Sequence, residues 1–473
     1  MNTLDFARDQ FMITTLFHFI FVPISIGLAS FVAICQTRYY RTGNEMYLRM
    51  TKFWGKFLLI SMAIGVVTGI VQEFQFGMNW SVYSRYVGDV FGAPLAMEGL
   101  IAFFLESTFL GLWIFGWGRL SPKLHLATIW LVAAGTALSA YFILAANSWM
   151  QHPVGYTINH VTHKAVLTNI FAVMFNSTVL LAYPHTVLGA FTTAGMLVIA
   201  ISAFLMLTGK GGQVASSSMR MALPITLVMV ILTMGFGDGQ GRLMMKQEPM
   251  KMAAAEAVYH TGTAQGISVL AVGALKHNPG HLNVDVKIPH LLSLIETLSW
   301  NGTVKGMDNI QAQDRAKYGP GNYIPIVGVE YWSFRLMIGA GILMTLIVLI
   351  GIYLVWFRRK VETSKWFLRF ALLGVLLPIA ANWMGWIFTE FGRQPWVVTG
   401  LLKTSVANSP NVSKLDIIVT LAGYVLIYGV LITIGGVLMH REAKHGPEPD
   451  PVDDDGSNLP QPDVEHPELV MAY

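Results

Sequence analysis

Nine long apolar stretches constrain this chain more than any other feature of its sequence. A helix that crosses the hydrocarbon of a membrane needs about 20 predominantly apolar residues. Such stretches lie at 12–36, 57–76, 93–117, 124–146, 179–208, 219–236, 334–357, 367–388 and 416–439. Hydrophobic residues make up 54% of the 473 residues and charged residues only 12%, which is too little charge to cover a soluble globule. We therefore predict an all-α integral membrane protein with about nine transmembrane helices.

The distribution of Lys and Arg predicts how these helices are oriented. The short loops on one side of the predicted spans, including the segment after the ninth, carry 16 Lys and Arg, and those on the other side carry 6. Basic residues accumulate on the cytoplasmic side of a membrane. We therefore expect the N-terminus outside and the C-terminus in the cytoplasm. The formal net charge of +4 gives no indication of a nucleic-acid partner, and the single cysteine, Cys35, excludes a disulfide scaffold.

The spans divide the chain into four segments. Residues 1–236 hold spans one to six, and residues 334–445 hold spans seven to nine. Between them, 237–333 form a polar external loop of roughly 97 residues, which is longer than an ordinary connection and indicates a function. Residues 446–473 form an acidic, proline-rich cytoplasmic tail that we expect to be disordered. No internal repeat supports an inverted-repeat transporter.

Several polar side chains lie within or beside the apolar spans, where they are costly and therefore candidates for function. With the predicted orientation, most of them lie near the outer face, and only Glu106 approaches the middle of the membrane. Five tryptophans are nearby: Trp149, Trp332, Trp383, Trp386 and Trp396. The candidates are His18, Glu98, Glu106, His185, Arg335, Met337 and Glu390.

Their chemistry favours haem, although each residue alone has a simpler explanation. His and Met are the paired axial ligands of low-spin haem iron, and a lone His serves where iron stays open to oxygen. A single His can instead be a hydrogen-bonding residue between helices, and Met337 can be one gap-filling Met among 25. Glu98 and Glu106 lie about two helical turns apart, which suits a proton path or a pair sharing one proton. Arg335 can extend to the membrane surface.

Eight segments in order carry a resemblance to a known family. They are RDQFMITTLFHFIFVPISIG (8–27), FGAPLAMEGLIAFFLESTFLGLWIFGW (91–117), NSWMQHPVG (147–155), YPHTVLGAF (183–191), GDGQG (237–241), KMAAAEA (251–257), YWSFRLMIGAG (331–341) and GWIFTEFGRQPW (385–396). With these motifs the chain resembles subunit I of the cytochrome bd-type quinol oxidases, over nearly its whole length except the tail. The last segment, with its EFGRQPW core, is the most specific.

The resemblance implies three haems: a low-spin haem b, a high-spin haem b and haem d. His185 and Met337 would ligate the low-spin haem b. His18 would ligate one high-spin haem and Glu390 the other, and the assignment of haem d between them stays open. The further cofactor-binding residues that it implies are Arg335, Arg393 and Trp396, with the arginines paired to haem propionates.

The resemblance also implies the reaction. The enzyme would oxidise a membrane quinol, menaquinol or ubiquinol, and reduce O₂ to water. The external loop would be the Q-loop in its short form, with Lys251 and Glu256 at the quinol site. Glu98 would lie beside the oxygen-binding haem and Glu106 on a route for protons from the cytoplasm. A proton motive force would then arise without pumping.

Partners and alternatives follow from the same comparison. We expect a homologous subunit II and leave small single-span subunits open, in a multi-pass protein of the bacterial cell membrane. One departure from many relatives is Gly118, which stands where an acid often follows the third span, so this position provides no acid to assist proton entry. Cys35 alone cannot form a disulfide within the loop. The alternatives are a bd-like oxidase with haem b only, a secondary transporter and an anchoring subunit.

Overall fold

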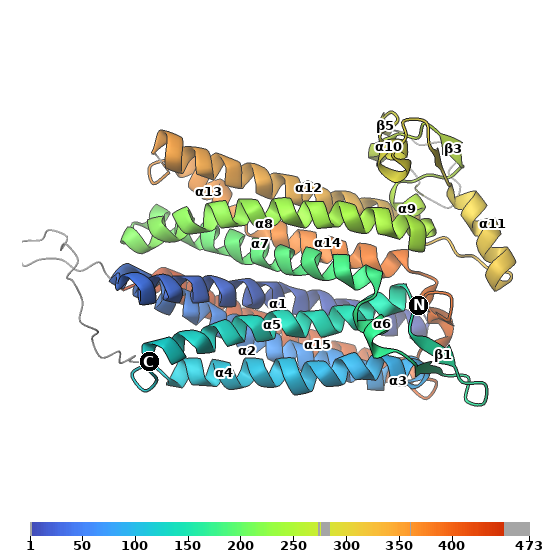
Figure 1. Ribbon diagram of the computed structural model, residues 1–473, viewed down its shortest axis with the longest axis horizontal. Coiled ribbons are helices and arrows are strands. Elements are labelled where there is room, and N and C mark those ends of the chain that lie inside the picture. Colours follow the sequence, from blue (N-terminus) through green and yellow to red (C-terminus); the bar gives the residue numbers. More distant parts are fainter. Residues whose placement is uncertain (1, 273–274, 276–283, 360, 449–473) are drawn as a thin grey trace, which may run out of the picture.

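The computed structural model describes residues 2–272, 275, 284–359 and 361–448. Within these ranges, nine helical segments are long and apolar enough to cross a membrane, and each corresponds to one of the nine predicted stretches, although the third segment ends at Phe115, two residues before the predicted end. They lie roughly side by side along the long axis of the molecule (Figure 1). The prediction of an all-α membrane protein is confirmed, whereas the orientation of the termini stays a prediction. The predicted disordered tail lies outside the described residues except for its first three.

Six of the nine spans are single α-helices, and three are composite. The single helices are α1 (Thr3–Thr42), α2 (Glu45–Met78), α5 (Pro122–Gln151), α7 (Ser177–Thr208), α8 (Gly212–Gln247) and α15 (Lys414–His445). The third span joins α3 (Ser81–Met97), a π-helical segment (Glu98–Phe103) and α4 (Phe104–Phe115). The seventh joins α12 (Val327–Ile352) to a π-helical segment (Tyr353–Arg358), and the eighth joins α13 (Lys365–Leu373) to α14 (Leu376–Gly392).

Local sequence explains several helix ends. Asn2 and Ser413 each form a capping box with the acid three residues later, Asp5 and Asp416, which satisfies free N–H groups at the starts of α1 and α15. α1 and α7 stop at Gly43 and Gly209, which adopt the left-handed conformation that favours glycine.

The predicted external loop is shorter in the structure and is folded. α8 continues through the GDGQG segment to Gln247 and α12 begins at Val327, so the connection covers 248–326, which we call the loop. The sequence placed the start of the loop at Gly237, but Gly237 and Gly239 lie within α8 and face α7, where their missing side chains leave room for His185 and Leu181. Tertiary packing therefore extends the helix beyond its sequence signal.

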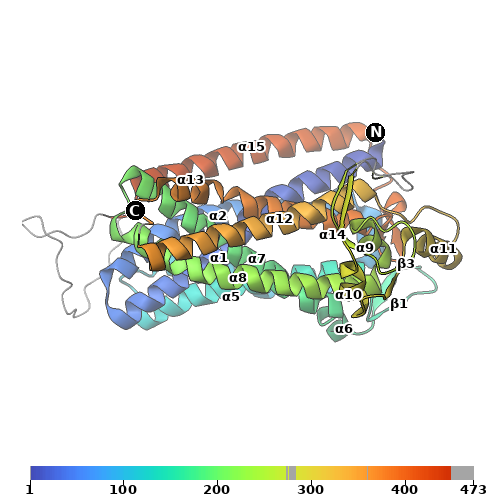
Figure 2. The same cartoon turned by 90° about the horizontal axis from the view of Figure 1, so that it is seen from above.

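The loop contains short helices and two-stranded sheets at one end of the bundle, which we call the loop end (Figures 1 and 2). Its elements are α9 (Pro249–Ala255), β3 (Gly262–Thr263), β4 (Ile267–Val272), β5 (Val284–Ile288), α10 (Leu291–Thr297), β6 (Thr303–Val304) and α11 (Met307–Tyr318). β3 pairs with β6 and β4 pairs with β5, both antiparallel. A small apolar cluster that includes Met250, Ala254, Met307 and Ile310 joins the loop to Val327 of α12.

Two further connections lie at the same end. One, between α5 and α7, contains the antiparallel strands β1 (Tyr156–Ile158) and β2 (Ala165–Leu167) and the short helix α6 (Ile170–Met174). The other, between α14 and α15, contains the antiparallel strands β7 (Trp396–Val398) and β8 (Leu402–Lys403), followed by a 3₁₀ turn (Thr404–Val406).

The bundle has one densely packed half and one hollow half. The main apolar cluster uses the parts of the membrane helices away from the loop, and it includes Trp54, Phe57, Trp113, Met219 and Phe367. The halves nearer the loop surround a cavity instead. α1 connects both halves, because it packs against α2, α5, α7, α14 and α15. The packed half therefore stabilises the bundle while the other half can enclose a ligand.

Close packing of α1 on α7 depends on Gly27. A β-carbon added to Gly27 would lie 2.4 Å from the β-carbon of Ala194 and 2.6 Å from the carbonyl oxygen of Ala190. Both distances are shorter than van der Waals contact, and one of these atoms belongs to the backbone. Gly77, near the end of α2, has no such neighbour within 4 Å.

We expect Gly27→Ala to lower the free energy of unfolding by about 1–3 kcal/mol, because it overpacks the α1–α7 interface. Gly77→Ala is the matched control, and it should be neutral or stabilising because alanine favours a helix over glycine. Thermal unfolding of both variants in the same detergent measures the difference. Equal midpoints for the two variants would show that the α1–α7 contact does not need a glycine.

Candidate functional site

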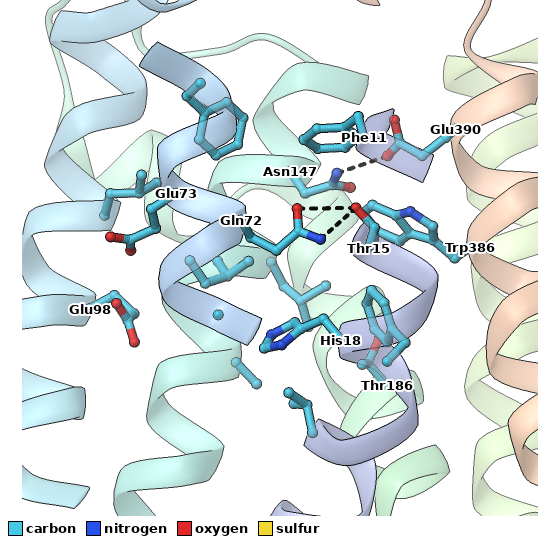
Figure 3. Close-up of a pocket in the computed structure, with 18 of the residues that line it drawn as sticks. Phe11, Thr15, His18, Gln72, Glu73, Glu98, Asn147, Thr186, Trp386 and Glu390 are labelled. Carbon is cyan, nitrogen blue, oxygen red and sulfur yellow. Dashed lines mark hydrogen bonds between the residues drawn. The ribbon is translucent and has the colours of Figure 1, made fainter. Parts of the chain in front are cut away.

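A cavity of about 900 Å³ opens among the helices in the half of the bundle near the loop. α1, α2, the third span, α5 and α14 contribute most of its wall. Five of the residues singled out from the sequence line it: His18, Glu98, Glu106, Glu390 and Arg393. Figure 3 shows the His18 side chain between Glu98 and Glu390, with Trp386 on the Glu390 side. Residues distant in the sequence therefore converge on one space.

His18 is oriented by a row of hydrogen bonds between α1 and α2, which we call the α1–α2 ladder. Its pairs are Gln10–Gln75, Thr15–Gln72, His18–Thr68 and Ser25–Ser61, all in one antiparallel register. The Thr68 hydroxyl donates to the carbonyl of Ile64, so its oxygen accepts the hydrogen bond from His18 Nδ1 at 2.8 Å. His18 Nε2 then keeps a free lone pair, which is the arrangement that a metal-binding imidazole needs.

Glu98 and Glu106 line the cavity from the third span, but the helix between them is not regular. A π-helical segment begins at Glu98 and ends at Phe103, so the angle expected for an uninterrupted α-helix does not apply. Ser139 of α5 donates to Glu98 Oε1 at 2.7 Å. Gly135 of α5 lets the backbone approach at Glu106, since an added β-carbon would lie 3.1 Å from the Glu106 nitrogen. α5 therefore contacts the Glu98 carboxylate directly and the Glu106 residue through its backbone.

Glu390 and Arg393 lie at the end of α14 and form an ion pair. The other Glu390 oxygen accepts a hydrogen bond of 3.1 Å from Asn147, whose own oxygen accepts one from Gln151. Arg393 is 4% exposed, yet its Nε and Nη1 have no hydrogen-bond partner within the described part of the chain. Buried guanidinium donors normally have acceptors. The cavity wall therefore carries unused, positively charged donors beside a carboxylate.

His185 and Met337 lie outside the cavity lining, at one level of α8. His185 Nδ1 donates to the carbonyl of Thr233 at 2.9 Å, which leaves Nε2 free, and its ring faces Gly237. On α12, Gly341 faces Met234, and Met337 is about one turn nearer the loop, which is the level of Gly237 on the antiparallel α8. Both candidate ligands thus flank α8 at the same height.

α14 separates the candidate site at His185 and Met337 from the cavity. A β-carbon added to Gly385 would lie 2.9 Å from Met337 Sδ, whereas the next residue, Trp386, lines the cavity. On α7, Thr186 lines the cavity directly after His185. The two candidate sites are therefore adjacent, with only single helices between them.

His125 shows the alternative arrangement of a buried histidine. Gln36 donates to its Nδ1 at 2.8 Å, and its Nε2 donates to the carbonyl of Trp113 at 2.9 Å. Both ring nitrogens are occupied, so His125 is a structural residue in the packed half. His18 and His185 each use only Nδ1.

Glu256 of the loop and Arg335 of α12 form a largely buried ion pair of 2.6 Å. Arg335 also donates to the carbonyls of Ala255 and Ser268, so it joins α12 to α9 and β4. Burial raises the pKa of Glu256, and the charge of Arg335 opposes that shift. Burial and the charge of Glu256 raise the pKa of Glu296 to about 7. Arg335, expected to pair with a haem propionate, is thus largely occupied by the loop.

Lys251 is buried in α9 and pairs with Glu248 at 3.3 Å. Its Nζ also donates to the carbonyl of Thr389 in α14 at 3.4 Å and lies 5.1 Å from the centre of the Phe388 ring. Lys251 and Glu256, both predicted at the quinol site, therefore contact α14 and α12 respectively.

Trp396 lies in an aromatic cluster between the loop and the α14–α15 connection. It stacks on Tyr323 with 5.8 Å between ring centres and meets Tyr318 edge-on at 5.0 Å. Lys403 Nζ lies over the rings of both Tyr323 and Trp396. Trp396 therefore packs the loop against the connection between α14 and α15.

Several residues of the site were missed by sequence reasoning. Glu73 lines the cavity and lies beside Glu98 in Figure 3, and Arg8 lines it near the N-terminus. Glu330, buried at the start of α12, lies beside Lys251 where both side chains approach Gly392. Glu73 carries the same signal as the residues that were found, an ionisable group inside an apolar span. Asn147 and Gln72 carry no comparable signal, because neutral polar side chains are frequent in membrane helices.

Comparison with known proteins decides the family. The sequence model for cytochrome bd terminal oxidase subunit I matches residues 6–447. The chain belongs to this family. It is 44% identical to the cytochrome bd ubiquinol oxidase subunit 1 of Bacillus subtilis, over 95% of each chain. It is 36% identical to the cytochrome bd-II ubiquinol oxidase subunit 1 of Escherichia coli, over 94% of this chain and 97% of that one.

Two further comparisons agree. A putative cytochrome bd menaquinol oxidase subunit I of Bacillus subtilis is 28% identical over 96% of this chain and 99% of its own length. The solved structure of bd oxidase from Geobacillus thermodenitrificans has the same fold, with a TM-score of 0.84 at 24% identity, covering 94% of this chain and 99% of that one.

Membership of the cytochrome bd subunit I family confirms the predicted enzyme class, a quinol oxidase of the multi-pass membrane type, over the transporter and anchoring alternatives. It also implies haem cofactors, a subunit II partner, and quinol and O₂ as substrates. The bacterial cell membrane is the location consistent with the family and the nine spans.

The residues of this cytochrome bd subunit fit haem on structural grounds. A porphyrin needs an apolar space, an axial ligand and cations for its propionates. The cavity provides the first, His18 Nε2 is free for the second, and the unpartnered Arg393 donors suit the third. His185 Nε2 and Met337 Sδ, flanking α8, are a His/Met pair without hydrogen bonds at these atoms within the described residues.

Proposed function

We propose that this subunit oxidises a membrane quinol beneath the loop and carries the site at which O₂ is reduced to water. The observation that supports this most is the cavity, where His18 with a free Nε2 and Arg393 with unpartnered N–H groups face one space. The names of two relatives specify ubiquinol and that of a third menaquinol, so the proposal covers both quinols.

Four residues would bind haem iron. His185 and Met337 would hold a low-spin haem b, and His18 and Glu390 would hold a high-spin haem b and haem d. The bound haems would supply electron transfer and the iron at which oxygen reacts. Arg393 would bind propionate oxygens with the donors that Glu390 leaves free. Asn147 positions Glu390 from α5.

The loop would provide the quinol site. Glu256 would accept a proton from the quinol hydroxyl, because burial favours the protonated carboxyl group. Arg335 fixes the Glu256 side chain by donating to its Oε2, and the backbone of Ser268 also hydrogen-bonds to this carboxylate. Lys251 would bind the second quinol oxygen through its ammonium group.

The carboxylates of the third span would carry protons. Glu106 lies deeper from the loop end than Glu98, and both line the cavity. Protons would enter from the cytoplasm, pass Glu106 and then Glu98, and arrive where O₂ is reduced. Because quinol protons would leave at the loop end, charge would be separated across the membrane without pumping.

Replacing the candidate haem ligands should give two complementary spectra. We expect His185→Ala to abolish the low-spin haem b bands and retain the high-spin bands, and His18→Ala to remove high-spin absorption and retain the low-spin bands, because the two side chains lie in separate places. Reduced-minus-oxidised absorption spectra measure both. His440→Ala, exposed on α15, is the control. Retention of low-spin bands in His185→Ala would refute the ligand assignment, and absence of chlorin bands in the wild type would favour the haem b-only oxidase.

Glu106→Gln should slow turnover about 100-fold while all haems remain, since the amide has similar size but cannot transfer a proton. Oxygen consumption with excess quinol, together with the haem spectrum, tests this. The control is Glu442→Gln, which alters a carboxylate paired with Lys56 at the opposite end. Normal turnover with intact haems would exclude Glu106 from the proton route.

Arg335→Gln should move the acidic limb of the kcat/KM–pH profile to higher pH by about one unit. A proton acceptor works when deprotonated, so oxidation rises with pH as Glu256 loses its proton. Arg335 lowers the pKa of Glu256, and its removal raises that pKa further. Lys287 also lowers the pKa of Glu256, and Glu296 is a neighbouring acid whose own pKa is raised by Glu256. Both residues are unchanged in the variant. An unshifted limb, with exposed Arg242→Gln as the control, would contradict Glu256 as the acceptor.

A further inference from the structure

A buried acid–base cluster lies where α9, α12 and α14 meet. Its members are Glu248, Lys251 and Glu330, none more than 9% exposed. Lys251 Nζ makes two long hydrogen bonds, 3.3 Å to Glu248 Oε2 and 3.4 Å to the Thr389 carbonyl. A buried ammonium is costly unless opposite charge surrounds it. The position of Lys251 therefore depends on its neighbours.

Glu330 is the unexplained member of this cluster. It is 0% exposed, and neither carboxylate oxygen has a hydrogen-bond partner within the described residues. A buried carboxylate is costly without a cation nearby, and the Lys251 side chain lies beside Glu330 at Gly392. Neither Glu330 oxygen makes a hydrogen bond to Lys251 within the described residues, so proximity rather than a hydrogen bond relates the two side chains.

Gly392 brings the two side chains together. A β-carbon added there would lie 2.7 Å from Glu330 Oε1 and 2.5 Å from Lys251 Cγ. Both side chains therefore meet at the bare backbone of this glycine. Gly392 belongs to the EFGRQPW segment, and here its lack of a side chain makes room for the charged pair.

The two carboxylates act on Lys251 in different ways. Glu248, directly before α9, accepts a hydrogen bond from the ammonium of Lys251 three residues later. Glu330 belongs to α12 and meets Lys251 at α14. Without the Glu330 charge, Glu248 alone would attract the ammonium, and the contact with Thr389 would weaken. The field of Glu330 therefore favours Lys251 docked on α14.

We propose that Glu330 is a positioning residue of the quinol site, which keeps the Lys251 side chain docked against α14 and so sets the affinity for quinol. This inference rests on the proposed role of Lys251. The docking point is the carbonyl of Thr389, directly before Glu390. Lys251 and Glu330 thus contact this turn of α14 from the side of the loop, while Glu390 of the same turn lines the cavity.

The test is a double-mutant cycle in the complete oxidase, with a water-soluble short-chain quinol as substrate. Glu330→Gln should raise the KM for quinol roughly tenfold with a smaller change in kcat and an unchanged haem spectrum. Lys251→Met should raise KM by a similar factor. Because Glu330 acts through Lys251, the double variant should match Lys251→Met alone. Glu362→Gln, the same change at an exposed position at the opposite end, should leave KM unchanged.

Each other result has a distinct meaning. If the two changes raise KM by factors that multiply in the double variant, the inference is overturned and the quinol site is retained. The same holds if KM is normal in Glu330→Gln but raised in Lys251→Met. A normal KM in Lys251→Met would refute the proposed role of Lys251 itself, and the inference with it. If Glu330→Gln fails to assemble, Glu330→Asp retains the charge at a greater distance, and an unchanged KM there would also overturn the inference.

Discussion

The need to satisfy polar groups inside an apolar bundle underlies most of this structure. Away from water, each imidazole, amide and carboxylate requires a partner from the chain or from a ligand. The α1–α2 ladder shows the first solution, since Gln10, Thr15, His18 and Ser25 are all paired across two helices. The unpartnered donors of Arg393 and the free Nε2 atoms of His18 and His185 show the second, because they suit a bound cofactor.

The division of the bundle into a packed half and a hollow half separates the polar groups that suit a cofactor from the packing that stabilises the helices. Large side chains such as Trp54, Trp113 and Phe367 fill the half away from the loop, where dense packing stabilises the helices. The hollow half then needs only local support, and α5 and α14 provide it through Ser139, Asn147 and Gly385. α14 is shared by every site, because its turns contact Met337, the cavity and Lys251.

Sequence reasoning predicted the nine spans because the hydrophobic requirement acts locally, over consecutive residues. It also selected His18, Glu98, Glu106 and Glu390, since ionisable groups in apolar segments are conspicuous. It ended α8 too early at GDGQG, because helix propensity cannot register that Gly237 and Gly239 pack against α7. It could not find Glu330, which lies just before the apolar stretch and is buried where α12 meets Gly392 of α14 and Lys251 of α9.

The sequence by itself determined the membrane class, the family motifs and the residue types available for haem and proton chemistry. These follow from composition and from order along the chain. Only the tertiary structure decided which residues meet: that His18 and Glu390 share a cavity, that Arg335 binds Glu256, and that Lys251 and Glu330 meet at Gly392. The reason is that helix packing depends on side-chain shape and on missing side chains, which act between segments that are distant in the sequence.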